Sequence, residues 1–327
     1  MRGSCVPRVP KRTITPRRIR RVTGDRAMTD YSGRLPGLAM PYVGIVGIVL
    51  ALARFLIASE FITYGIRKLL HPENIYGLIE AHHLPGEFVY LVIPWQIGFG
   101  LATLLGFQTR LAAIALFGFC VIAPSIFWLN NLENLTRDYA TAGGFIFLFV
   151  FGPGPISLDA KYGWDGRDLA WNLSSKLWDR LPTDKALVFG RALMATPFIA
   201  DAFKKAQEQM LFQGDGISAS FVHVLIIVES VSALMLVVGY RTRLAGAVLT
   251  LWSLVLAFDL HSPASFLGLY TENFSTMVHN LFQKNGGTLS SFYKDIAVVG
   301  ALLMLVVYGP GELAWDARSR SGLMRQT

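Results

Sequence analysis

The chain has 327 residues, of which 53% are hydrophobic and 16% are charged, and its net charge is +8. Soluble proteins average about 25% charged residues, so the composition excludes the soluble globular class and indicates an integral membrane protein. The net charge does not indicate nucleic-acid binding, because ten of the thirty Lys and Arg residues lie in the first 34 positions, in a tail with few apolar residues.

Residues 1–43 form this basic tail, for which we expect no fixed structure. Eight apolar segments follow, each close to the length that a membrane-crossing helix needs. The fourth and eighth are short, and we expect them to continue outwards through Thr136 and Ser290. The predicted spans are Gly44–Ile66, Phe88–Leu105, Leu111–Leu129, Tyr139–Phe151, Ala186–Phe203, Ala219–Val238, Leu244–Leu260 and Phe292–Tyr308.

The same succession of motifs occurs twice in the chain. Each copy has an Arg followed by a Lys fourteen residues later, a G-x-x-T-R-L-A turn, a basic residue before an Asp, and a G-P-G triplet before a second Asp. These elements are Arg54, Lys68, 106–112, Arg137-Asp138, 152–154 and Asp159 in the first copy, and Arg191, Lys205, 239–245, Lys294-Asp295, 309–311 and Asp316 in the second. We therefore predict an all-α integral membrane protein with two tandem four-helix bundles, residues 44–160 and 186–318, related as a parallel repeat.

Three further segments connect or extend these units. Leu and Trp recur every four and every seven residues in the linker 161–185, which predicts an amphipathic helix on the membrane surface; a polar connector is the alternative. The second unit carries an insertion at 262–291, where either a functional loop or a packing lid is expected. Residues 319–327 form a short tail.

The distribution of Lys and Arg predicts the orientation. With the amino terminus inside, the cytoplasmic segments hold 21 of these residues and the opposite side holds 7, while Arg54 and Arg191 lie within spans. Cytoplasmic loops of membrane proteins are enriched in Lys and Arg. We therefore expect both termini in the cytoplasm.

The repeated motifs resemble the DoxX/DoxD family of small bacterial membrane proteins. The resemblance covers about residues 44–160 and 186–318, and the first copy's ending, 154–159, is the closer match. It implies a duplicated four-helix unit, a location in the bacterial cytoplasmic (inner) membrane, and membrane-bound redox chemistry linked to quinone or to oxidative-stress defence. The second copy departs from the family pattern at Pro197 and Asp201 in its first helix and at its Ala-Trp-Asp ending.

Polar residues inside the apolar spans are the candidate site. A charge near the bilayer centre costs at least about 2.5 kcal/mol and needs a partner, so we expect Glu229 to neutralise Arg191 and Glu60 to serve Arg54. Two interpretations stay open: these residues lock the helices together, or they form a pocket for a quinone headgroup or another small polar ligand. The candidate residues are Arg54, Glu60, Lys68, Gln96, Arg191, Asp201, Lys205 and Glu229.

Four other repeated residues are predicted to have structural roles. Arg110 and Arg243, in the turns, are expected to bind lipid phosphate or to cap the preceding helix. Asp138 and Asp295 are expected to cap the free N–H groups at the start of the last helix of each unit. No metal site is predicted, because the histidines and the two cysteines lack ligand spacing.

The sequence contains no electron-carrying motif of its own. We therefore expect no intrinsic cofactor: the redox cofactor is either a quinone or belongs to a partner. The expected partners are the lipid bilayer and redox enzymes, and no nucleic acid. The rival functions are a non-catalytic scaffold for a partner complex and, third, a small-molecule transporter.

Overall fold

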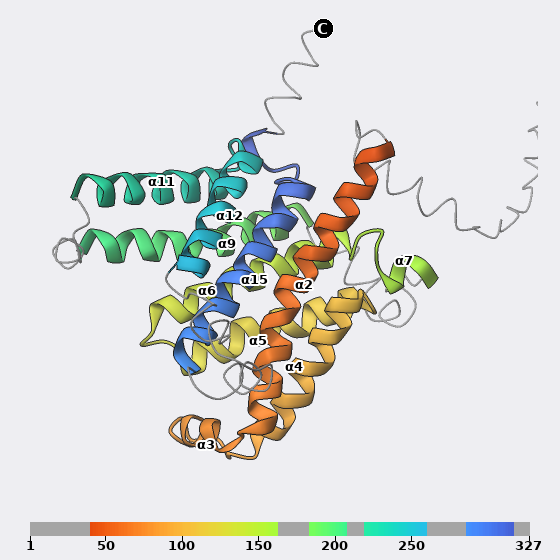
Figure 1. The fold of residues 1–327 in the computed structure, drawn as a ribbon, viewed down its shortest axis with the longest axis vertical. Helices are drawn as coiled ribbons and strands as arrows, with labels where there is room; N and C mark the ends of the chain where they lie inside the picture. The colour runs from red at the N-terminus through yellow and green to blue at the C-terminus, as the bar shows by residue number, and fades with distance from the viewer. Residues whose placement is uncertain (1–39, 163–182, 208–218, 260–285, 317–327) are drawn as a thin grey trace, which may run out of the picture.

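A computed structural model describes residues 40–162, 183–207, 219–259 and 286–316, and within these residues every regular element is a helix (Figure 1). The predicted linker and insertion lie largely outside the described residues. The first unit contains α2 (Met40–Leu70), α3 (Glu73–Glu80), α4 (Phe88–Leu105), α5 (Thr109–Phe127) and α6 (Leu132–Phe151), followed by α7 (Leu158–Tyr162). The second contains α9 (Thr183–Gln207), α11 (Ala219–Val238), α12 (Thr242–Asp259) and α15 (Gly286–Tyr308).

The helix boundaries follow from local chemistry. Gly106 and Gly239 adopt left-handed φ values of 66° and 81°, which end α4 and α11, because glycine has no Cβ to oppose this conformation. The Asn131 side chain accepts a bond of 3.1 Å from the Asn134 amide and so starts α6 before Thr136. The predicted outward extension of both short spans is confirmed, since α15 also begins before Ser290.

Among the residues that the structure describes, five helices are long and apolar enough to cross a membrane, which supports the all-α membrane class. Two shorter apolar helical stretches, His223–Val238 and Thr242–Ala257, lie in α11 and α12. The five are Gly44–Leu70, Phe88–Leu105, Thr109–Phe127, Thr183–Gln207 and Ser291–Tyr308.

The helices of the two units pack in two mixed rows, which refines the expected pair of four-helix bundles. One row runs α4–α2–α15–α12, and the other runs α11–α9–α6–α5. Figure 1 shows α2, α4 and α15 inclined along the long axis, whereas α9 and α11 run across the view. Each row therefore combines the first two long helices of one unit with the last two of the other, and α6 and α15 join the rows.

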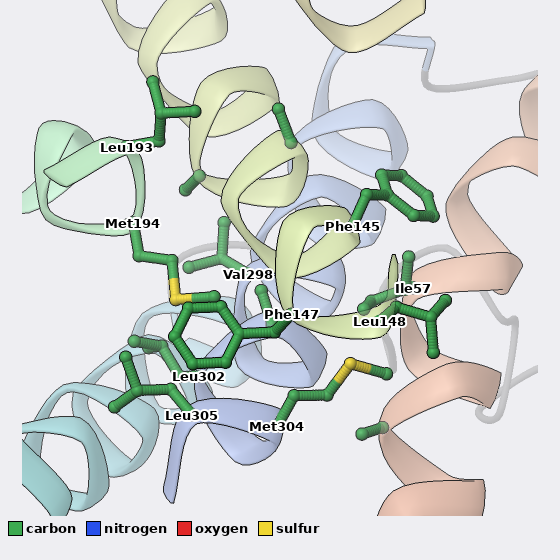
Figure 2. Packing of buried hydrophobic residues seen from close by; sticks show 14 of the residues in the cluster. Ile57, Phe145, Phe147, Leu148, Leu193, Met194, Val298, Leu302, Met304 and Leu305 are labelled. Carbon is green, nitrogen blue, oxygen red and sulfur yellow. The ribbon is translucent and has the colours of Figure 1, made fainter. Parts of the chain in front are cut away.

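The hydrophobic core lies where the units meet. Figure 2 shows Phe147 of α6 beside Met194 of α9 and Leu302 of α15, with Ile57 of α2 near Leu148. The helices approach closely because small residues lie at the crossings: a Cβ on Gly143 would be 2.5 Å from the Gly190 carbonyl oxygen. Small residues permit such close approach in membrane bundles.

Candidate functional site

The G-x-x-T-R turn of the first unit is held by an aspartate from the end of the same unit. Asp159 Oδ1 accepts a bond of 2.8 Å from the Gln108 amide, and Oδ2 accepts bonds of 2.9 Å from the Thr109 amide and 2.7 Å from its hydroxyl. The Asp159 amide in turn donates to the Gly106 carbonyl. The aspartate thus caps the free N–H groups at the start of α5.

The second unit repeats these contacts. Asp316 Oδ1 accepts from the Arg241 amide at 2.8 Å, and Oδ2 accepts from the Thr242 amide at 3.0 Å and from its hydroxyl at 3.3 Å. Its own amide donates to the Gly239 carbonyl. The two repeated motifs therefore build equivalent turns.

The buried arginines lie at these turns, which corrects the expected pairing of Arg191 with Glu229 and leaves that of Arg54 with Glu60 a prediction. The Arg54 guanidinium donates to the Ile156 carbonyl. The Arg54 guanidinium packs against Gly106, and the Arg191 guanidinium packs against Gly239. A Cβ at either glycine would collide with the guanidinium beside it. Arg191 therefore lies at the turn, away from Glu229.

Arg243, Asp138 and Asp295 differ from expectation, whereas the role of Arg110 stays a prediction. Arg243 Nη2 donates at 3.3 Å to the Val307 carbonyl in the last turn of α15, so it caps that helix rather than α11, which precedes it. Arg110 lies in the first turn of α5. Asp138 is buried inside α6 and is not its N-cap, and Asp295 is likewise inside α15.

Two ion pairs cross between the units. Lys294 Nζ of α15 lies 2.9 Å from Asp138 Oδ1 of α6, and Arg137 Nε of α6 lies 2.9 Å from Asp295 Oδ1 of α15. The basic residue of each unit therefore binds the acid of the other. Glu60, which is 5% exposed, lies within electrostatic reach of Asp138 and Lys294. Sequence reasoning did not include Arg137 or Lys294 in the site, although the repeated basic-Asp pair was a signal for them.

In the first unit, Lys68 and Gln96 come together as candidate site residues. Lys68 Nζ donates to Gln96 Oε1 at 2.7 Å, so an amide is the partner of this lysine. The same Nζ lies 5.8 Å from the ring centroids of Tyr64 and Phe119, within the range of a cation–π contact.

In the second unit, the corresponding lysine has two acidic partners. Lys205 Nζ lies 2.5 Å from Glu229 Oε1 and 2.9 Å from Asp201 Oδ2. The Trp252 Nε1–H also donates to Glu229 Oε1, and the Trp252 ring lies 5.1 Å from Lys205 Nζ. Trp252, which was not predicted, occupies the position of Phe119 relative to the turn.

A cavity of about 350 Å³ lies between α6, α9, α12 and α15, where the two units meet. Its polar lining includes Arg137 and Asp295, and Asp201 is the one predicted pocket residue that lines it. The apolar lining includes Pro197 and Phe198 of α9. Arg137 Nη1 also lies 2.8 Å from Glu133 Oε1, so two carboxylates hold its guanidinium at the cavity.

Comparison with known proteins gives separate matches for the two units. The DoxX family model matches residues 49–149, and the SURF4 family model matches residues 208–321. No solved structure matches the chain.

Two relatives come from Escherichia coli (strain K12). Inner membrane protein YqjF is 34% identical over 119 residues, which make up 35% of this chain and 90% of the relative. Inner membrane protein YphA is 25% identical over 127 residues, again 35% of this chain and 90% of the relative. Together with the buried charges and apolar helices, these matches show that the chain is an integral membrane protein of the DoxX family.

Proposed function

We propose that this protein is a bacterial cytoplasmic-membrane subunit that serves quinone-linked redox chemistry, and that the cavity between α6, α9, α12 and α15 receives the quinone headgroup. The observation that carries the proposal is the cavity with the guanidinium of Arg137, whose side chain is 12% exposed, in its wall. Its volume of about 350 Å³ is within the usual range for small-molecule sites, about 300–1,000 Å³.

The lining suits a flat ring with two carbonyl groups. Phe198, Leu256 and Val298 offer apolar surface to the ring. Arg137 offers N–H donors to a carbonyl oxygen, because a guanidinium has five and its contacts with Glu133 and Asp295 engage only some of them. The apolar walls and few polar groups follow the pattern of cofactor sites.

The chain would bind and orient the quinone, and a partner enzyme would supply the electrons. A quinone headgroup accepts two electrons and two protons when it is reduced to the hydroquinone. Arg137 would hold a carbonyl oxygen as negative charge develops on it, and the paired acids would keep the guanidinium in place. With two cysteines 115 residues apart and no C-x-x-C pair, the sequence provides no cluster of its own to carry electrons.

The test is mass spectrometry of quinone that co-purifies with gently solubilised protein. Changing the cavity pair together, Arg137→Leu with Asp295→Leu, removes the donor without leaving a lone charge, and should lower bound quinone about tenfold. The matched control is the other crossed pair, Lys294→Leu with Asp138→Leu, which does not line the cavity and should retain quinone. Equal loss in both variants would contradict the assignment of the cavity.

A second measurement separates this function from its rivals. Quinone reduction by membranes from a deletion strain should be slower than in the parent strain and restored by the intact gene. If the wild-type protein carries no quinone and deletion leaves quinone reduction unchanged, the redox proposal is refuted, and a scaffold for a partner complex becomes the leading function.

The proposed orientation places both termini in the cytoplasm, because Lys and Arg are three times as frequent on that side. Single cysteines test it in a chain without Cys5 and Cys120. Gly286→Cys should react with an impermeant thiol reagent in intact cells, and Gly163→Cys should react only after the cells are opened. The reverse pattern would invert the topology.

A further inference from the structure

The contacts between the two units come in equivalent pairs. Gly143 of α6 packs on Gly190 and Met194 of α9, and a Cβ there would lie 2.5 Å from the Gly190 carbonyl oxygen. At the corresponding position of the second unit, a Cβ on Gly300 of α15 would lie 2.6 Å from the Ala53 carbonyl oxygen of α2. In both cases, the last long helix of one unit packs on the first long helix of the other.

The crossed ion pairs follow the same rule. Arg137 and Lys294 occupy equivalent positions, as do Asp138 and Asp295, since each pair follows its unit's G-x-x-T-R turn and precedes its G-P-G triplet. Each basic residue binds the acid of the other unit at 2.9 Å. Contacts in which i meets j′ and j meets i′ are the mark of an isologous, two-fold interface.

We infer that the second unit occupies the place of a second copy of the first, so that the face formed by a unit's first and last long helices is a self-recognition surface. Its partner is another four-helix unit of the same kind, here supplied by the same chain. The inference does not depend on the proposed quinone function, because it uses only the contacts between helices.

The observed grouping of the helices explains why the units need each other. Each row of four combines two helices from each unit, so a single unit would leave the core residues of its α2 or α9 and its α6 or α15 without the opposing surface. Buried charges add a second reason, because Asp138 pairs with Lys294 and Arg137 pairs with Asp295, and both of these buried partners belong to the other unit. An unpaired charge in this environment is costly.

The experiment uses the full chain with a protease site inserted within residues 163–182. After cleavage of the purified protein in mild detergent, the two fragments should elute together at the size of the intact chain. Gly143→Leu or Gly300→Leu should lower the recovered complex several-fold, because each leucine collides with backbone of the other unit. Gly98→Leu and Gly118→Leu are the matched controls, since a Cβ at either glycine meets nothing within 4 Å.

A charge swap keeps the test decisive if the leucine variants do not fold. Asp295→Arg alone should release the fragments, and Asp295→Arg with Arg137→Asp should restore their association. Separation of the unmodified fragments, or a swap no better than the single reversal, would overturn the inference.

Self-recognition is tested by substitutions that make interface residues of the second unit identical to their counterparts in the first. Met194→Ile, Lys294→Arg and Ala301→Gly give the second unit the residues that the first has at Ile57, Arg137 and Gly144. The cleaved chain should remain assembled and lose only a few degrees of thermal stability. Dissociation of this variant, with intact helical content, would show that the two faces are not equivalent.

Discussion

The two units share their turns and differ in their buried polar sites. Asp159 and Asp316 hold equivalent turns through the same hydrogen bonds. The lysines fourteen residues beyond the buried arginines have different partners. Lys68 binds the amide of Gln96, whereas Lys205 binds two carboxylates, one of which also accepts from the Trp252 indole N–H.

This comparison separates the turn contacts, which the fold needs in both units, from the lysine sites, which can differ between them. The turn contacts satisfy backbone N–H groups at the starts of α5 and α12 that have no partner within their own helix, so both units need them. The lysine sites consist of contacts between side chains, so their charge can differ between the units without a change in the positions of the helices. The acid also shifts by one helical turn, from Glu60 in the first unit to the position of Asp201 in the second, where Pro197 replaces Glu60. Pro197 and Asp201 both line the cavity.

The largest expected effect is at the second lysine site. Lys205→Leu removes the cation from Glu229, which is 1% exposed, and should lower the free energy of unfolding by about 3–5 kcal/mol. The double variant Lys205→Leu with Glu229→Leu should be less damaging, because no buried charge remains. Thermal unfolding in detergent measures both. A double variant that is less stable than the single one would contradict the pairing.

The tryptophan of the second site should give the next largest effect. Trp252→Phe gives the second unit the residue that the first has at Phe119, and it removes the N–H that donates to Glu229. A hydrogen bond to a charged group contributes about 1.5–3 kcal/mol, so we expect a loss of that order. The control, Trp95→Phe, removes an exposed indole that donates to the Ala115 carbonyl at 3.3 Å, and should cost less. Equal losses would show that the Glu229 contact adds nothing.

The sequence predicted the helices and turns better than the pairings between polar residues. Glu229 lies ten residues before Gly239, about 15 Å along a helix, whereas the Arg191 guanidinium covers Gly239 itself. The two therefore do not meet, a conclusion that needs the position of the guanidinium in the structure as well as the helical spacing. Glu60 is six residues from Arg54, about 9 Å along α2.

The crossed ion pairs between the units could not be predicted from helical spacing. Arg137 and Asp138 are adjacent in sequence, and the repeat makes Lys294 and Asp295 equally suitable as partners. A repeated pattern fits contacts within a unit and contacts between units equally well, so only the packing of α6 and α15 decides between them. The prediction that Asp138 and Asp295 cap helix starts failed because α6 and α15 begin earlier than their apolar runs.

The glycine turns should show equal effects in the two units. Gly106→Ala and Gly239→Ala force a Cβ into a left-handed conformation, which costs about 1–2 kcal/mol, and they displace a buried guanidinium as well. The control, Gly118→Ala, lies inside α5 with open space around its Cβ and should be neutral or stabilising. Unfolding temperatures that place either turn variant level with Gly118→Ala would contradict the role of the turns.

The smallest expected effect comes from removing the capping aspartates, and it tests whether the two turns are equivalent in energy. Asp159→Ala and Asp316→Ala each remove the acceptor for two backbone amides and a threonine hydroxyl, so each should cost roughly 0.5–2 kcal/mol, the range for a lost helix cap. Asp159→Asn and Asp316→Asn keep one acceptor oxygen and should recover part of the loss. Thermal unfolding of all four variants measures this difference. If Asp159→Ala unfolds the protein while Asp316→Ala has no effect, the two turns are equivalent in geometry but not in energy. Because the first unit's contacts to Thr109 are the shorter ones, any inequality should favour a larger loss at Asp159.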